Sequence, residues 1–223
     1  MTKERESLIE VDLARAEVFR VNVEIARVNL TGAKLDLARR QEEFDREHAQ
    51  DFHHHTFTLA GGINGSSVSQ VIETLGMWSR MDGAEPKPME LRIHSPGGEV
   101  LSGMALFDEL TRLANHGHHM TTTVLGYAAS MASILVQAGT TRVMGRESYL
   151  LIHEMSSIAV GKIGEIEDMA EVMQKMQDRV LEIFLTRSAG RISKASFVKH
   201  WKRKDWWVDS QECLKWGFVD EVR

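Results

Sequence analysis

The sequence predicts an α/β protein in which repeated crossover units form a largely parallel sheet, preceded by a charged and mostly helical extension. Two observations carry this prediction. From about residue 52 onward, short β-branched runs alternate with longer amphipathic runs, which is the pattern of helical crossovers between parallel strands. Residues 1–51 contain no proline and are dense in charge, so we expect them to lie outside the domain formed by residues 52–223.

Composition bounds the function. The chain has 223 residues, of which 43% are hydrophobic and 26% charged, which is ordinary for a soluble globular domain with a real core. A net charge of −5 and a pI near 6.1 predict no phosphate-binding surface. We therefore expect no nucleic-acid partner.

Cysteine content and hydropathy indicate the compartment. Cys213 is the single cysteine, which excludes an intrachain disulfide framework and a cysteine metal clip. No stretch approaches the roughly 20 apolar residues that span a bilayer, and the charged N-terminus does not resemble a secretory signal. We expect a cytoplasmic protein without a membrane partner.

Two periods compete within the extension. Val18–Leu30 is rich in β-branched residues, so this part is left open between helix and strand, whereas Ala33–Gln50 is typical of helix. Gly32 is a candidate break. Apolar residues spaced alternately by three and four, as in a coiled-coil seam, are Val11, Ala14, Val18, Val21, Ile25 and Val28. We interpret the extension as an appendage that packs on a partner chain.

The first elements of the sheet domain follow in order. "HTFTLAGGING" predicts a short strand that ends in a glycine turn, and "SSVSQVIETLGMWSRM" predicts a helix capped by Ser66 or Ser67. After a loop come the strand "MELRIHS", the turn "PGGE" and the helix "VLSGMALFDELTRLANHG". This order gives one complete crossover unit.

The second half repeats the pattern. "HMTTTVLG" predicts a strand, "ASMASILVQAG" a helix that ends at Gly139, and "TRVMG" and "YLLIHE" two further strands. The run from Gly164 to Gly190 predicts a long amphipathic helix whose apolar stripe serves core or subunit packing. That stripe consists of Ile166, Met169, Met173, Met176, Val180 and Phe184.

Three short motifs carry the chemistry. Ser130 in "GYAASMA" falls in the first turn of a helix, where unpaired N–H groups and the helix dipole favour negative charge. It is either an N-terminal cap or a nucleophile. His153 ends an apolar strand, at the sheet edge where sites gather, or is a structural hydrogen-bonding group. Pro96-Gly97-Gly98 predicts a turn with exposed N–H groups that suits an oxyanion.

The other histidines have simpler interpretations. His53 to His55 are expected to form a solvated tract at the domain edge, and His116, His118 and His119 a polar loop. No acidic or cysteine partner is evident near the tract, so we predict no metal site.

Taken together, "SPGG", "GYAASMA" and "IH" resemble the Clp protease proteolytic subunit family, and "KDWWVDSQECLKWGFVDEV" resembles its C-terminal motif. The resemblance covers about residues 52–223. It implies the fold shared with crotonases, with repeated units and a protruding helix. It also implies a serine endopeptidase without a cofactor, in which Ser130 is the nucleophile, His153 the base and Asp205 the acid. Asp209 and Asp220 lie close to Asp205 in the sequence and remain alternatives.

The same resemblance implies further site residues. The amides of Gly98 and Met131 would form the oxyanion hole, while Gly97 and Val100 would bind substrate. Three residues depart from the family pattern, since Glu154-Met155 replaces Gln-Pro and His94 replaces asparagine.

The family also implies partners. We expect peptides or unfolded protein segments as substrates and a homo-oligomer of heptameric rings, single or stacked, with the long helix and "SSIAVGKIG" at the interface. An AAA+ unfoldase is an expected partner of the family. The unusual extension leaves open instead a phage head-maturation protease that processes capsid or scaffold proteins without an ATPase.

Three other functions are weighed. A crotonase-like enzyme would act on acyl-CoA without a serine triad, and a Ser-Lys peptidase would use a lysine such as Lys162 as base. A non-catalytic scaffold subunit would need none of these groups, yet Ser130, His153 and Asp205 are all in place.

Overall fold

The computed structural model describes residues 3–48, 53–156, 158 and 160–223, and its contacts divide the chain into Met1–His53 and His54–Arg223. Side chains are described for residues 15–40 and from residue 53 onward, except at 157 and 159. The predicted boundary between residues 51 and 52 lies outside the described residues. The two units are therefore treated separately.

In the first unit the structure describes one long helix, α1, which runs from Lys3 to His48. The predicted helical extension is confirmed, and the segment left open, Val18–Leu30, is helical. The expected break at Gly32 is wrong, because the helix continues through it. One glycine costs about 1 kcal/mol relative to alanine in a helix interior, and helix formers such as Ala33, Lys34 and Leu35 follow it.

The second unit is built on a seven-stranded sheet, and the predicted α/β class is confirmed. Strands β1, β2, β3, β4 and β7 lie side by side in that order, and β5 pairs with both β3 and β6. All pairs are parallel except that of β5 with β6. The strands are β1 (Thr56–Ala60), β2 (Met89–Ser95), β3 (Met120–Ala129), β4 (Thr141–Met144), β5 (Tyr149–Ile152), β6 (Trp206–Asp209) and β7 (Glu221–Val222).

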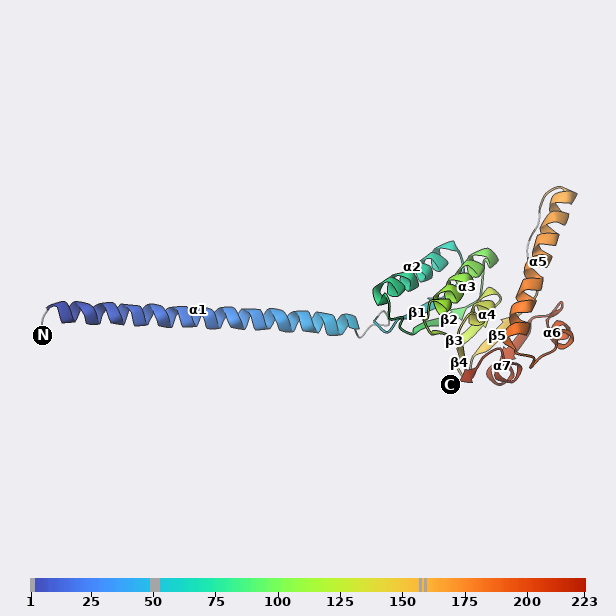
Figure 1. Cartoon of the computed structure of the whole chain (residues 1–223). Coiled ribbons are helices and arrows are strands. Elements are labelled where there is room, and N and C mark those ends of the chain that lie inside the picture. Colours follow the sequence, from blue (N-terminus) through green and yellow to red (C-terminus); the bar gives the residue numbers. More distant parts are fainter. Residues whose placement is uncertain (1–2, 49–52, 157, 159) are drawn as a thin grey trace. The chain divides into compact units, whose positions relative to one another are not determined.

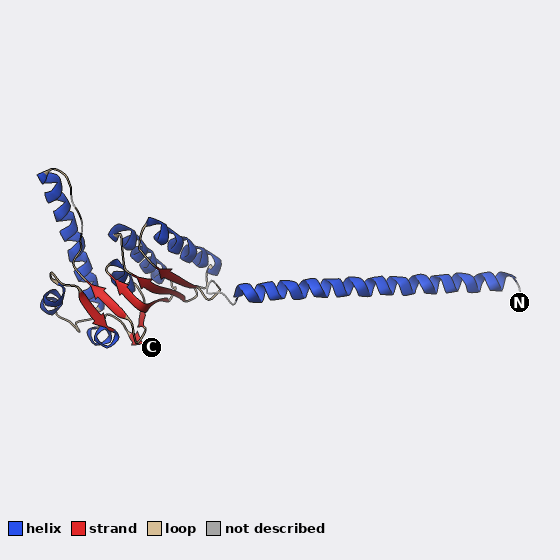
Figure 2. Ribbon diagram, turned by 180° about the vertical axis from the view of Figure 1, so that it is seen from behind, coloured by secondary structure: helices blue, strands red, loops and turns tan. Residues whose placement is uncertain are grey.

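Helices follow the strands as the crossover pattern requires (Figure 1). Figure 2 shows the molecule from behind, where the strands lie in front of α2 and α3. The long helix α5 extends well beyond the sheet. The helices of this unit are α2 (Gly65–Asp82), α3 (Val100–Asn115), α4 (Met131–Val136), α5 (Ile163–Arg187), α6 (Lys194–Trp201) and α7 (Ser210–Trp216).

The cap of α2 is not the one predicted. Asn64 is the N-cap, and its side chain accepts hydrogen bonds from the backbone N–H groups of Ser66 and Ser67. The Ser67 hydroxyl in turn lies 3.0 Å from the Asn64 N–H and completes a capping box. Asparagine caps a helix as well as serine does, and the cap lies two or three residues before the predicted Ser66 or Ser67.

Two histidines are also placed differently from the prediction. His55 is buried, stacks on Trp78 and lies with its Nδ1 3.5 Å from a carboxylate oxygen of Asp82. His118 is buried as well, with its Nε2 2.9 Å from Ser79 Oγ. The sequence separates these partners by many residues, and the packing of α2 against the sheet brings them together. Both histidines therefore serve the core of the second unit.

Candidate active site

Strand β3 changes partner along its length, and this change creates the site. Its first half pairs with β4, and its second half, Tyr127–Ala129, pairs with β5. The switch occurs at Gly126, whose φ of 70° few residues other than glycine adopt. Because parallel strands carry their carboxyl ends to one edge, the residues that follow β3 and β5 are neighbours.

The strand registers then bring three predicted residues together. In the parallel β3–β5 ladder Ala129 is opposite Leu151, so Ser130 falls level with Ile152, one residue before His153. In the antiparallel β5–β6 ladder Ile152 is opposite Trp206. One step further, His153 stands opposite Asp205. The predicted serine, histidine and aspartate thus occupy the ends of three adjacent strands.

Ser130 itself occupies a strained turn. Its backbone has φ 54° and ψ −126°, a region that is essentially reserved for glycine and costs on the order of 1–3 kcal/mol. The turn is held from both sides: the Ser130 N–H donates to the Leu151 carbonyl at 2.9 Å, and the Ser133 hydroxyl donates to the Ser130 carbonyl at 2.7 Å. Ser130 is the N-cap residue of α4, but its side chain makes no capping hydrogen bond. The capping interpretation therefore does not explain this serine.

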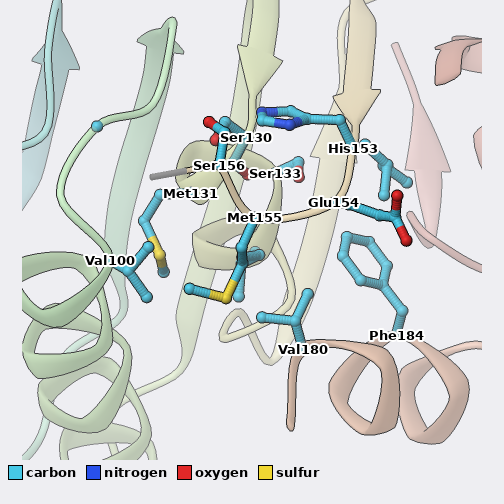
Figure 3. A pocket seen from close by; sticks show the side chains of 13 residues that line it. Val100, Ser130, Met131, Ser133, His153, Glu154, Met155, Ser156, Val180 and Phe184 are labelled. Carbon is cyan, nitrogen blue, oxygen red and sulfur yellow. Dashed lines mark hydrogen bonds between the residues drawn. The ribbon is translucent and has the colours of Figure 1, made fainter. Parts of the chain in front are cut away.

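A cavity of about 80 Å³ lies beside this turn. Figure 3 shows the imidazole of His153 directed from the end of β5 toward Ser130. Apolar side chains of Val100, Val180 and Phe184 form part of the wall. The cavity thus combines a hydroxyl and an imidazole with surfaces that exclude water.

Two backbone N–H groups border the same cavity. Met131 is the first residue of α4, so its N–H has no intrahelical acceptor. Gly98 forms an isolated bridge with Ile63, whose hydrogen bonds use the Gly97 carbonyl and the Glu99 N–H. The N–H of Gly98 therefore forms neither hydrogen bond of that bridge. Both Gly98 and Met131 line the cavity beside Ser130.

The two residues expected to bind substrate differ in position. Val100 lines the cavity, whereas Gly97 does not line it and instead packs against Ala129 and Ser130. A Cβ atom added at Gly97 would come within 2.5 Å of the Ala129 carbonyl and 2.7 Å of Ser130 Cβ. Gly97 therefore permits the close approach of the glycine turn to the serine turn.

Asp205 is the aspartate of the C-terminal motif that shares a surface with His153. Both residues line a second, shallow pocket, together with Arg203 and Lys204. The two alternatives are engaged elsewhere. Asp209 caps α7 by accepting the Glu212 N–H at 2.8 Å, and Asp220 pairs with Arg142.

Among the described residues, the side chains of Ser130, His153 and Asp205 form no hydrogen bonds with one another. The strand registers bring the three residues to neighbouring strand ends without joining their side chains. Catalytic hydrogen bonds are often long in a free enzyme and shorten when substrate binds.

In the sequence, Glu154 stands out only because it replaces the glutamine of the family motif. In the structure, its side chain forms a hydrogen bond to the loop before Asp205. Its carboxylate accepts the backbone N–H of Arg203 at 2.7 Å. Arg203 has a positive φ of 56° and lies two residues before Asp205. Glu154 therefore fixes the loop that carries the aspartate. A glutamate after the histidine was visible in the sequence, but its partner lies 49 residues away.

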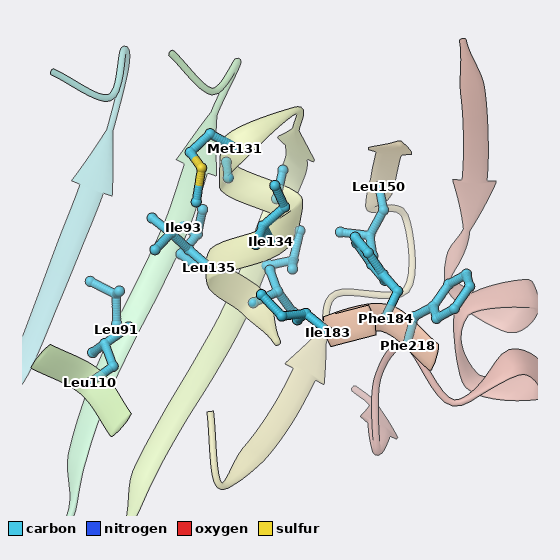
Figure 4. Packing of buried hydrophobic residues seen from close by; sticks show 14 of the residues in the cluster. Leu91, Ile93, Leu110, Met131, Ile134, Leu135, Leu150, Ile183, Phe184 and Phe218 are labelled. Atoms are coloured by element: carbon cyan, nitrogen blue, oxygen red, sulfur yellow. The ribbon is translucent and has the colours of Figure 1, made fainter. Parts of the chain in front are cut away.

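The floor of the site is rigid. All six residues of α4 are buried, and Figure 4 shows Met131, Ile134 and Leu135 packed among core side chains from β2 and α5. Close packing of this kind holds the turn at Ser130 in place despite its strain.

The structure gives no support to a lysine base, a metal site or a membrane helix among the described residues. Lys162 precedes α5 and is exposed, and it does not line the cavity. Among the described residues, no group of three or more histidine, cysteine, aspartate or glutamate side chains is arranged to hold a metal ion. None of the described helices combines the length and apolarity that a membrane crossing requires.

Comparison with known proteins points in one direction. The family model described as Clp protease matches residues 39–223. An ATP-dependent Clp protease proteolytic subunit from Bacteroides fragilis is 32% identical over 147 residues, which cover 64% of this chain and 67% of the relative. ATP-dependent Clp protease proteolytic subunit 1 from Protochlamydia amoebophila is 30% identical over 168 residues, 74% of this chain and 78% of the relative. The subunit from Dehalococcoides mccartyi is 28% identical over 166 residues, covering 74% and 79%.

Proposed function

Since the chain belongs to the Clp protease family and is a serine peptidase of that type, we propose that it cleaves peptide bonds through Ser130, His153 and Asp205. The observation that carries the proposal is the strained turn at Ser130, where a serine that caps nothing faces an imidazole across a small cavity. Acyl-CoA chemistry and a scaffold role are not favoured, because the family and the relatives are proteolytic.

In the proposed reaction His153 accepts the proton of Ser130 as Oγ attacks the substrate carbonyl. The negative oxygen that develops is stabilised by the N–H groups of Gly98 and Met131, each donor contributing about 3 kcal/mol to the transition state. His153 then gives its proton to the leaving amine, and an acyl-enzyme remains. Water, activated by the same imidazole, releases the acid product. Asp205 orients the ring and stabilises its charged form.

A fluorophosphonate probe tests the assignment, because it reacts only with an activated serine. We expect labelling of the wild type, detected by intact mass, and loss of labelling in Ser130→Ala and His153→Ala. Ser156→Ala is the matched control, since Ser156 lines the same cavity, and Lys162→Ala tests the lysine base. Labelling that survives in Ser130→Ala, or disappears in Lys162→Ala alone, would contradict the triad.

Family membership implies an oligomeric assembly, and we propose rings of subunits, heptameric by resemblance, that contact one another through α5. Ile166, Met169 and Val172 on the outer part of α5 are 39–48% exposed, and Ile158 in the preceding segment is 93% exposed. Such an apolar surface is a liability on a monomer. Met169→Glu combined with Val172→Glu should reduce the mass in native mass spectrometry, whereas Glu171→Gln on the same turn should not.

The substrate class rests on family membership. We propose that peptides and unfolded segments enter, and that short peptides are hydrolysed without ATP because they need no unfolding. The head-maturation alternative, supported by the 46-residue α1, predicts that capsid or scaffold protein is cleaved by the chain alone. A requirement for an AAA+ unfoldase with an unfolded test protein would favour the ATP-dependent role instead.

A further inference from the structure

Helix α1 carries two lines of apolar side chains on opposite sides. The line that we name seam A consists of Val18, Val21, Ile25, Val28 and Leu35, with Gly32 between the last two. Seam B consists of Phe19, Val23, Ala26, Leu30, Ala33 and Leu37. In both seams the spacing alternates between three and four residues, as in helices that pack along their whole length. At about 100° per residue, Val21 and Val23 point roughly 160° apart.

Neither seam is covered within the chain. Every described side chain of α1, from residue 15 to residue 40, is exposed, including Phe19 at 69% and Leu37 at 68%. Valine and isoleucine are weak helix formers, and a helix of this kind gains most of its stability from packing. A helix with 46 residues, about 70 Å long at ~1.5 Å per residue, therefore needs a neighbour on each side.

Charged residues indicate what that neighbour is. Glu17 and Glu24 border seam A, while Arg20 and Arg27 border seam B on the same side of the helix. Within the described part of α1, none of these four side chains forms an ion pair. If seam A of one parallel helix contacts seam B of the next, the glutamates of one chain lie opposite the arginines of the other.

We propose that α1 packs side by side with α1 of two neighbouring copies of this chain, in parallel, with seam A of each helix against seam B of the next. If two helices instead packed seam A against seam A, seam B of each helix would remain in water. In the antiparallel form of that pair, Glu17 and Glu24 of one chain would also face the same glutamates of the other. The contact is heterologous and repeats from copy to copy. Because the seams are about 150° apart on the side of Asn22 and Asn29, the row of helices curves toward those asparagines.

Engineered cysteines test this arrangement in the full-length chain. Cys213 is buried, and burial raises the pKa of its thiol, so the native background is unreactive. Cross-linking is measured in the wild-type background and again in the Ser130→Ala form, whose substitution lies outside α1, so the result does not depend on the catalytic assignment. Val21→Cys places a thiol in seam A and Val23→Cys places one in seam B. Their Cβ atoms point apart, so they cannot pair within one helix.

On mild oxidation we expect the double variant to form a ladder of dimers, trimers and larger species on denaturing gels. Each single variant should remain monomeric. Dimers from Val21→Cys alone would show that seam A pairs with itself and would overturn the proposal. Monomers from all three variants would show that α1 has no copy of itself as neighbour, and this outcome also overturns it.

Charge reversal provides a second test. Glu17→Lys with Glu24→Lys in the double-cysteine chain should reduce cross-linking roughly tenfold, because like charges then face each other. Adding Arg20→Glu and Arg27→Glu should restore it. Failure of the restoration would contradict the parallel seam A to seam B contact, whereas general unfolding of α1 would appear separately as a loss of helical circular dichroism.

Discussion

His153 stands opposite Asp205, one residue beyond the last pair of the β5–β6 ladder, Ile152 and Trp206. This register places Asp205 nearer to His153 than Asp209 is, which supports our proposal that Asp205 is the triad acid. We predict that Asp205→Asn lowers kcat on the order of 10³-fold or more with the fold preserved, as expected when the orienting carboxylate of a serine triad is lost. Steady-state hydrolysis of a short fluorogenic peptide, with circular dichroism as the check on folding, measures this.

Asp209 provides the matched control. It is opposite Tyr149, four residues along the ladder from His153 and therefore about 13 Å away. Asp209→Asn should leave kcat within a small factor of the wild type, while Asp209→Ala should lose about 1 kcal/mol of stability with the cap of α7. A greater loss of activity in the Asp209 variant would move the triad acid to that residue.

The hydrogen bond from the Arg203 N–H to Glu154 makes Glu154 a positioning residue. Glu154→Ala frees the loop before Asp205, so we predict a loss of kcat of about tenfold with KM nearly unchanged, since a misplaced catalytic group acts on the chemical step. Glu154→Gln keeps an acceptor oxygen and should recover most of the rate.

The split between kcat and KM separates positioning from a purely structural role, because a misplaced catalytic group slows the chemical step while substrate binding is kept. Unchanged kcat in Glu154→Ala, or equal losses in the alanine and glutamine variants, would contradict the role of this contact.

The strained backbone of Ser130 has a measurable cost. Glycine adopts its φ and ψ readily, so Ser130→Gly should be about 1 kcal/mol more stable to unfolding than Ser130→Ala, although both variants are inactive. Urea denaturation of the two variants measures the difference. If alanine proved the more stable, the turn would not be strained in solution.

Asp220 should make stability depend on pH. Burial alone would raise its pKa, but hydrogen bonds and the charge of Arg142 outweigh this and lower the pKa below its ordinary value. A carboxyl group with a lowered folded pKa stabilises the fold above its unfolded pKa of about 3.9, and this contribution disappears as the pH falls through the folded value.

We therefore predict that Asp220→Asn costs about 2 kcal/mol at pH 7, a figure reduced for the partial exposure of the pair. The difference from the wild type should shrink below about pH 4. Urea unfolding at both pH values checks this, with Glu221→Gln as control because its bond to Arg223 is exposed. If the difference in unfolding free energy between wild type and Asp220→Asn stayed constant with pH, the contact of Asp220 with Arg142 would not contribute to the pH dependence of stability.

Local patterns were enough to predict most of this fold, and the exceptions are instructive. The strand "MELRIHS" coincides with β2, because alternation and β-branching act within the strand itself. The N-cap of α2, by contrast, had three candidates, Asn64, Ser66 and Ser67, and asparagine and serine are about equally favoured at N-cap positions. The burial of His55 depended on Asp82 and Trp78, which only the packing of α2 brings close.

The site shows the same division. Ser130 and His153 were proposed as site residues because each follows a strand at a recognisable motif. The family resemblance favoured Asp205, but residue patterns alone left Asp209 open because both aspartates lie at the ends of β6. The antiparallel register, which brings Asp205 level with His153, supports the same choice. Likewise, a serine at a turn is a plausible cap until the backbone shows φ 54° and no capping bond.

Helix α1 and the sheet differ in how far apart along the chain their hydrogen-bonded residues lie, and this difference affects how fast each can fold. Every backbone hydrogen bond of α1 joins residues that are close along the chain, so the helix can form within about a microsecond. The sheet requires β4 to meet β7, with Val143 opposite Glu221, and β5 to meet β6, and such distant pairings fold in milliseconds to seconds. If α1 packs against neighbouring copies as proposed, chains can meet through their helices while the sheet units are still unfolded, so that association precedes the folding of the catalytic unit.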